Sequence, residues 1–330
     1  MKLAQFLRAA IVATFLSNCM SAPAQIQTPP TIRVIAVPSI PLPVAIAKMN
    51  GVFAKYGVEV QAEVAPSSDA LRKALASGEA DLAHAAVDNA VAMDETADVV
   101  IVMGGEGSRN ELIAQPSVHS VTELRGKILI VDAVHTAYAL QLKKILLAEG
   151  LQTGRDYELK PVGTTPQRLQ AMREHKDYAA SMLGPHTSVL AKHAGFVSLG
   201  STRQLIGPYQ ANGAFLTRRW AREHSDTLVR YLAAYIESQR WLLEPANRSR
   251  VLELLMKEWH LPAPVADEVY ALLKDGWFEE DARFDLEGFK NVLKLRAEVE
   301  GQWKGRPPAP EKYYDPSCYQ EALSKVKAAR

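Results

Sequence analysis

The stretch Gly78–Val91, GEADLAHAAVDNAV, places a short apolar run between polar residues. Residues 80–86 have the length and composition of a buried strand. Asp88 and Asn89 follow that run directly and would begin the next helix. In open α/β sheets, ligands bind beyond the C-terminal ends of the strands, against helix N-termini. We therefore expect Asp88 and Asn89 to face a binding cleft, while a plain N-cap role for Asp88 stays open.

Strand and helix patterns alternate on both sides of this stretch. Residues 32–37, 58–64 and 98–103 have strand patterns, and apolar residues at helical spacing separate them. The order helix, glycine, strand, amphipathic helix, strand occurs around Gly57 and again around Gly150. Such alternation favours open, mostly parallel sheets with right-handed crossovers. Two similar α/β lobes are the simplest interpretation.

The lobes are expected to be discontinuous in sequence. The first lobe would be formed by residues 31–114 and 207–330. The second of these segments would also add extra C-terminal helices, because the chain after Ser225 is nearly all helical in pattern. Residues 115–206 would form the second lobe. The chain would then cross between the lobes near Gln115 and again at residues 210–212.

Composition excludes several classes of protein. The chain has 330 residues, 48% of them apolar and 23% charged, with a formal net charge of +1. That balance gives no indication of a nucleic-acid partner. Past the N-terminus there is no apolar run of about 18 residues, the minimum for a membrane-spanning helix. The length fits two domains or one large α/β unit.

The N-terminus has the pattern of a secretory signal peptide. Lys2 and Arg8 precede a short apolar core at residues 9–16, and small residues follow at 21–24. We expect a signal peptide over residues 1–24 and a periplasmic protein. Lipidation at Cys19 is the alternative, although Asn18 fits poorly before a lipidated cysteine. Cleavage after residue 24 would leave Cys318 as the one cysteine, so no internal disulfide is expected.

Two long segments carry a resemblance to a known family. Residues 41–63, PLPVAIAKMNGVFAKYGVEVQAE, precede residues 70–85, ALRKALASGEADLAHA, and together resemble the first lobe of substrate-binding proteins of ABC importers. The nitrate, sulfonate and taurine type is most similar, with its relatives that bind thiamine-pyrimidine precursors. The matching positions are Gly51, Phe53, Gly57, Gly78 and Asp81. Residues 124–151 and 213–242 resemble the family's second lobe and returning strand, so the resemblance runs from residue 31 to about residue 320.

The resemblance implies a fold and a role. It implies the two-lobed periplasmic-binding-protein fold of type II, each lobe an open sheet flanked by helices. It also implies a monomer that captures a small molecule between the lobes and delivers it to an ABC permease. Residues 176–178 depart from the family pattern, which places Gly-x-x-Asp there.

The strand-end rule marks further candidate ligand-binding residues. Each occupies a predicted turn or helix start, so a capping or solvent-exposed role is the alternative. Asn212 precedes the returning strand and would lie near the hinge. The complete predicted set is Ser39, Pro41, Asp88, Asn89, His135, Thr136, His186 and Asn212.

Catalytic and cofactor motifs are mostly absent. The sequence has no Gly-x-Ser-x-Gly, no P-loop and no His-Glu-x-x-His. Gly105 and Gly107 form only a partial dinucleotide fingerprint, and Glu106 and Arg109 beside them would be solvated loop charges. We expect no enzyme activity, no cofactor and no metal. The alternatives are a periplasmic enzyme using Asp88 with His135 or His186, and a receptor module that feeds a signalling partner.

The ligand class follows from the same turns. The first turn is rich in proline, and Asp88 would add negative charge. A neutral or aromatic metabolite is therefore favoured over a small strong anion. The tryptophans at 241, 259, 277 and 303 fall on helical stretches, and we expect them to pack in the core or between the lobes.

Overall fold

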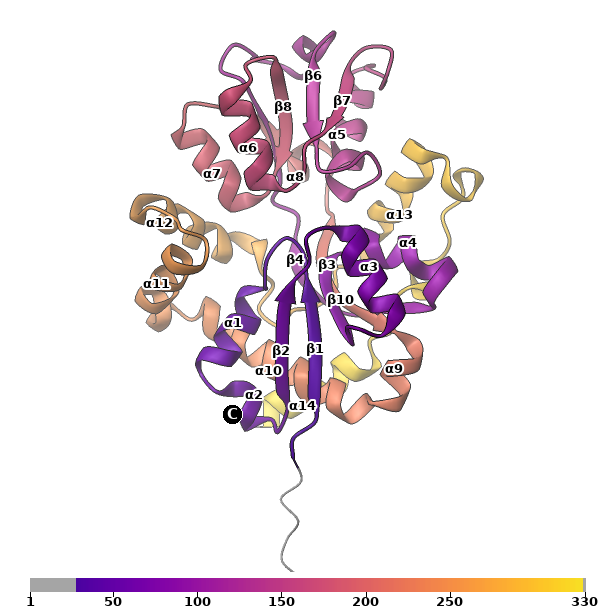
Figure 1. Cartoon of the computed structure of the whole chain (residues 1–330), viewed down its shortest axis with the longest axis vertical. Coiled ribbons are helices and arrows are strands. Elements are labelled where there is room, and N and C mark those ends of the chain that lie inside the picture. The colour runs from indigo at the N-terminus through magenta and orange to yellow at the C-terminus, as the bar shows by residue number, and fades with distance from the viewer. Residues whose placement is uncertain (1–27, 329–330) are drawn as a thin grey trace, which may run out of the picture.

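Two five-stranded sheets organise residues 28–328, the part of the chain that the computed structural model describes (Figure 1). The signal peptide predicted for residues 1–24, Cys19 included, lies outside the described residues. The sheet of lobe 1 has the order β2-β1-β3-β10-β4. Its strands are β1 (Thr31–Ala36), β2 (Glu59–Val64), β3 (Leu82–Ala86), β4 (Val99–Gly107) and β10 (Gln210–Thr217).

The sheet of lobe 2 repeats the same plan in the order β7-β6-β8-β5-β9. Its strands are β5 (Glu111–Ala114), β6 (Ile128–Val131), β7 (Glu158–Pro161), β8 (Tyr178–Leu183) and β9 (Val197–Ser201). In lobe 1, β1 runs parallel to β2 and β3, and β10 runs antiparallel to β3 and β4. In lobe 2, β6 runs parallel to β7 and β8, and β5 runs antiparallel to β8 and β9. Each antiparallel strand is the first that the chain forms after arriving from the other lobe, which confirms the predicted two-lobed α/β fold.

One lobe crossing follows β4, and the other follows the short helix after β9. Residues 111–114 form β5 and pair with β8 and β9, so the first crossing occupies residues 108–110 and precedes the position expected near Gln115. The second crossing follows α8 (Thr202–Leu205) and ends where β10 begins at Gln210. Gln115 lies inside lobe 2, where its side-chain amide donates to the carbonyls of Met172 and Tyr178.

Helices cover the faces of both sheets (Figure 1). α10 (Ser225–Leu243) has buried residues three and four apart, such as Leu228, Leu232 and Tyr235, and this apolar face packs against the lobe 1 core. Lobe 1 also carries α1 (Leu42–Met49), α2 (Val52–Lys55), α3 (Ser68–Ser77), α4 (Asp88–Ala97), α9 (Arg218–Glu223) and α14 (Ser317–Ala328). Lobe 2 carries α5 (Ala137–Ala148), α6 (Thr165–Glu174) and α7 (Pro185–His193). Among the described residues, no helix is both long enough and apolar enough to cross a membrane.

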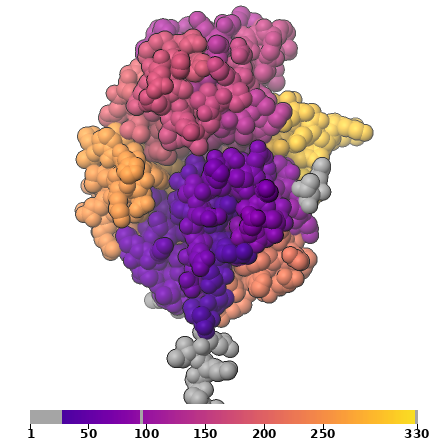
Figure 2. Space-filling model, viewed as in Figure 1, coloured from indigo at the N-terminus to yellow at the C-terminus, as the bar shows by residue number. Residues whose placement is uncertain are grey.

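Three C-terminal helices reach from lobe 1 to the flanks of lobe 2: α11 (Arg248–Glu258), α12 (Ala263–Leu272) and α13 (Leu286–Glu300). Figures 1 and 2 show α11 and α12 on one side of the molecule and α13 on the other. Val189 of α7 shares an apolar cluster with Val265 and Val269 of α12. On the other side, Leu140 of α5 shares an apolar cluster with α13. Lobe 2 therefore contacts helices of the C-terminal segment on two sides.

Candidate functional site

A cavity lies between the lobes, at the ends of strands from both sheets. From lobe 1 it is lined by the turn after β1, the end of β4 and the start of β10. From lobe 2 it is lined by the first turns of α5, α6 and α7. These positions are those at which open α/β sheets bind ligands.

Aromatic side chains form much of the cavity wall. The ring of His186, at the start of α7, stacks on Trp259 with a centroid distance of 4.6 Å and an interplanar angle of 24°. The ring centroids of Trp259 and Trp277 lie 5.9 Å apart. Tyr138 and Tyr235 add further rings to the lining. Both tryptophans also pack in the apolar cluster shared by α7 and α12, as the sequence pattern predicts. Their rings therefore bring the C-terminal helical segment into the cavity wall.

One carboxylate faces this aromatic wall. Oε2 of Glu106, near the end of β4, accepts hydrogen bonds from Asn212 Nδ2 at 2.9 Å and from Trp277 Nε1 at 3.2 Å. Within residues 28–328, Oε1 of Glu106 has no hydrogen-bond partner. Burial raises the pKa of the Glu106 carboxyl above its ordinary value, against the opposing effect of those two donors. The sequence-based expectation of a solvated loop charge at Glu106 is therefore wrong.

Glycines explain why β4 can carry Glu106 to the cavity. The strand continues through residues 104–107, where the sequence suggested a partial nucleotide-binding turn. A Cβ at Gly104 would lie 2.3 Å from the carbonyl oxygen of Arg283, so only glycine fits at this close approach. Gly105 has a φ of +158°, and a Cβ there would lie 3.4 Å from the hydroxyl of Tyr235. The glycines serve close packing of the strand end.

Two histidines line the cavity in their neutral form. His84 Nε2 lies 2.7 Å from the hydroxyl of Tyr231, and burial lowers the pKa of His84 to about 3. Burial likewise lowers the pKa of His186 to about 4. The lining contains neither Lys nor Arg, and Glu106 is its one carboxylate. At neutral pH the cavity wall is therefore aromatic, polar and, when Glu106 is ionised, negative.

Amide groups complete the polar part of the wall. Asn110 Nδ2 donates to Gln141 Oε1 at 2.9 Å, and the hydroxyl of Thr202 donates to the same oxygen at 3.2 Å. These bonds join the first crossing to α5 and α8. They fix the orientation of the Gln141 amide, which also lines the cavity.

Four of the predicted ligand-binding residues line this cavity: Ser39, Pro41, His186 and Asn212. Ser39 and Pro41 lie in the turn after β1, as the strand-end rule predicted. Asn212 lies in β10 and also holds Glu106. These four residues remain the proposed ligand contacts.

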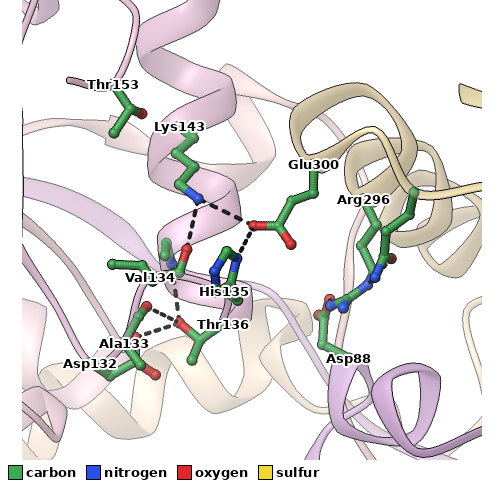
Figure 3. Close-up of polar contacts among 12 residues, drawn as sticks. Asp88, Asp132, Ala133, Val134, His135, Thr136, Lys143, Thr153, Arg296 and Glu300 are labelled. Carbon is green, nitrogen blue, oxygen red and sulfur yellow. Dashed lines mark hydrogen bonds and ion pairs between the residues drawn. The ribbon is translucent and has the colours of Figure 1, made fainter. Parts of the chain in front are cut away.

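Asp88 and Asn89 are turned away from the cavity lining. Arg296 NH1 of α13 donates to Asp88 Oδ1 at 2.8 Å (Figure 3). The hydroxyl of Tyr209 donates to Asp88 Oδ2 at 2.8 Å. Asn89 accepts from Arg72 at 2.7 Å and donates to the carbonyl of Ala86 at 3.1 Å. The carboxylate that ends the buried run of Gly78–Val91 thus has a buried guanidinium as its partner.

His135 and Thr136 also lie outside the lining. The His135 side chain is 73% exposed, and its Nδ1 lies 2.7 Å from Glu300 of α13 (Figure 3). Thr136 caps α5 by accepting from the Ala139 amide, and its hydroxyl donates to Asp132 at 2.6 Å. Asp88 and His135 are therefore not assembled with His186 in one cavity. No group of three or more His, Cys, Asp or Glu in residues 28–328 is arranged to hold a metal ion.

Comparison with known proteins supports the fold. A family model described as the NMT1-like family matches residues 36–121 and 128–256. Among solved structures, the periplasmic nitrate-binding protein NrtA of Synechocystis PCC 6803 is 14% identical, with a TM-score of 0.73, over 90% of this chain and 89% of that one. The alkanesulfonate-binding protein SsuA of Xanthomonas axonopodis pv. citri, bound to MOPS, is 16% identical, with a TM-score of 0.68, over 86% of this chain and 98% of that one.

A third solved structure with this fold is a DszB mutant in complex with biphenyl-2-sulfinic acid. It is 12% identical, with a TM-score of 0.63, over 90% of this chain and 99% of that one. At these identities the likeness establishes the fold. No curated protein matches the chain.

Proposed function

The chain belongs to the NMT1-like family, and from this premise we propose that it is an exported solute-binding protein of an ABC import system. It captures a small organic molecule between its lobes and delivers it to a membrane permease. One observation carries the proposal: a single cavity is lined by Glu106 and Trp277 from the lobe 1 side and by Tyr138 and His186 from lobe 2. A ligand that contacts both groups favours the closed arrangement of the lobes.

The cavity wall supports an aromatic or neutral organic molecule over a small strong anion. Trp259, Trp277 and His186 place aromatic rings in the cavity lining. An anion would find no Lys or Arg in the lining and would lie near Glu106. Charge repulsion in a site shielded from water costs several kcal/mol, which weighs against sulfonate or nitrate here.

Native mass spectrometry of the chain, exported and purified without refolding, tests the proposal. We expect a retained small molecule, and small-angle scattering should show a smaller radius of gyration with that molecule than after its removal. Loss of the molecule on mild denaturation, followed by rebinding, completes the test. A protein that retains nothing and whose scattering does not change with any added extract fraction would contradict the proposed function.

Two histidine substitutions locate the site. His186→Ala removes a ring that lines the cavity and stacks on Trp259, so we expect ligand affinity to fall about five- to thirty-fold, the equivalent of about 1–2 kcal/mol of aromatic contact. His119→Ala changes an exposed histidine of lobe 2 that does not line the cavity, and it serves as the matched control. Titration calorimetry of both variants measures the difference. A larger loss for His119→Ala would place the ligand elsewhere.

Ion pairs between α13 and α5 should support closure. Glu300 lies 3.2 Å from Lys143, and Glu298 lies 2.5 Å from Lys144, both across the lobe boundary (Figure 3 shows the first pair). If closure forms these pairs, Glu300→Gln should weaken ligand binding about two- to fivefold, since partly exposed pairs contribute up to about 1 kcal/mol. Glu287→Gln is the control, because Glu287 pairs with Lys290 of its own helix. Equal affinities for the two variants would show that these pairs do not depend on closure.

A further inference from the structure

We propose that the ligand carries a cationic nitrogen group, a protonated amine, amidine or guanidine, which binds the carboxylate of Glu106 while its apolar body lies against the tryptophans. This inference rests on the proposed function and names the chemical class of its ligand. Three features of the cavity carry it: a carboxylate with one unused oxygen, a lining without basic side chains, and an aromatic wall beside that carboxylate.

The hydrogen bonds of Glu106 leave half of its carboxylate available. Asn212 and Trp277 both donate to Oε2, which fixes the orientation of the group. Glu106 lines the cavity, and its Oε1 has no partner among residues 28–328. An ionised carboxylate is acceptor-only and has about four lone-pair sites, so the fixed oxygen and the unused one together suit a donor group with several N–H bonds. A protonated amine or amidine has that property.

The protein does not itself supply a positive charge to Glu106. Arg109 follows Glu106 closely in the chain, but its guanidinium pairs with Asp275 at 2.9 Å. Arg168 lies beneath Tyr138, with its guanidinium 4.8 Å from the ring centroid, and bonds to Ser181 and to the carbonyl of Met182. Neither arginine lines the cavity. A buried carboxylate without a cation is costly, and a cationic ligand removes that cost.

The rings of the wall favour a cation as well. Trp259 and Trp277 line the cavity beside one another, and Trp277 also donates to Glu106. The faces of tryptophan rings attract cations through their quadrupole, and more strongly where water is excluded. Aromatic faces and one carboxylate together therefore recognise a nitrogen cation by both charge and shape.

The protonation of Glu106 gives the inference a second readout. Because burial raises the pKa of Glu106, the group loses its proton at a higher pH than an exposed carboxyl. A cation binds the ionised form, so its affinity should rise with pH as Glu106 ionises. A neutral ligand that accepts from protonated Glu106 would show the opposite trend.

Three probes of nearly the same shape test the inference: benzamidine, benzamide and benzoate, which are cationic, neutral and anionic at pH 7. We expect the wild-type chain, freed of any retained molecule, to bind benzamidine most tightly and benzoate least. Titration calorimetry at several pH values should show benzamidine affinity rising with pH. Glu106→Gln should lose about ten- to a hundredfold in benzamidine affinity, the range of a charge-assisted pair, while benzamide affinity changes little.

Glu106→Gln keeps an acceptor for Asn212 and Trp277, so its fold should persist, and its thermal melt checks this. Glu111→Gln is the matched control, since Glu111 lies just beyond the crossing, pairs with Lys192 and does not line the cavity. Benzoate binding as tightly as benzamidine, no binding of benzamidine, or an unchanged preference in Glu106→Gln would each overturn the inference. A molecule retained by the exported protein that proves to be an anion would also overturn it while leaving the proposed function intact.

Discussion

Replacing Arg296 with methionine is expected to lower the free energy of unfolding by about 3–5 kcal/mol, the usual cost of removing one partner from a buried ion pair. The side chains of Arg296 and Asp88 are each 5% exposed and lie 2.8 Å apart. Without the guanidinium, the carboxylate of Asp88 stays buried with only the hydroxyl of Tyr209 as a partner. A urea titration of wild type and variant measures the loss.

Two further variants separate the charge from the packing. Asp88→Asn combined with Arg296→Met keeps an acceptor for Tyr209 and removes both charges, so it should recover much of the loss. Arg283→Met removes an exposed arginine that pairs with Glu279 on the surface, and we expect it to cost less than about 1 kcal/mol. A double variant no more stable than Arg296→Met alone would show that the unpaired charge of Asp88 is not the source of the loss.

Acidification from pH 7 to pH 4 should destabilise the chain through two buried histidines. The pKa of His84 is lowered to about 3 and that of His186 to about 4, both by burial. Unfolding returns each to an ordinary pKa near 6.5, so the unfolded chain binds more protons between these values. Stability is therefore lost as pH falls below about 6.5, by roughly 3 kcal/mol for each histidine at pH 4 at about 1.4 kcal/mol per pKa unit.

Glu106 acts in the opposite direction, because an acid with a raised folded pKa favours folding at low pH and disfavours it as pH rises. The measurement is the free energy of unfolding against pH for wild type, His84→Gln and the double variant with His186→Gln. Glutamine keeps a hydrogen-bonding group near Tyr231 while removing the titration. The slope between pH 6.5 and 4 should fall in the single variant and fall further in the double variant. An unchanged slope would mean that other groups govern the acid sensitivity.

The fold could be predicted because most of the buried strands have an apolar sequence pattern of their own. β8 is buried at every position, and β1 and β6 are largely buried, so an apolar pattern reveals them. β5 and β9 were missed, since β5 has only four residues and β9 is polar and only partly buried. Both are antiparallel neighbours within lobe 2, and their pairing depends on partners far along the chain. Because β5 was missed, the first crossing was predicted near Gln115, whereas it precedes β5 at residues 108–110.

Four of the eight ligand-binding residues predicted from the sequence line the cavity. The strand-end rule located Ser39 and His186 because their turns open directly onto the cavity. It also selected Asp88 and His135, whose side chains are bound by Arg296 and Glu300 of α13, a helix whose position no local pattern reveals. Glu106 was missed because neighbouring glycines suggested a loop where β4 continues. A strand end fixes where a side chain begins, and the packed surroundings decide where it points.

The placement of lobe 2 between α12 and α13 has a kinetic consequence. Opening would separate apolar contacts on both flanks, together with polar contacts such as the hydrogen bond of His193 with Glu268 on one side and the ion pair of Lys144 with Glu298 on the other. The dwell time of a captured molecule would then be set by how often both flanks release together, and less by the molecule's own contacts. In the proposed import function, a permease would shorten that dwell time by drawing either helix away from lobe 2.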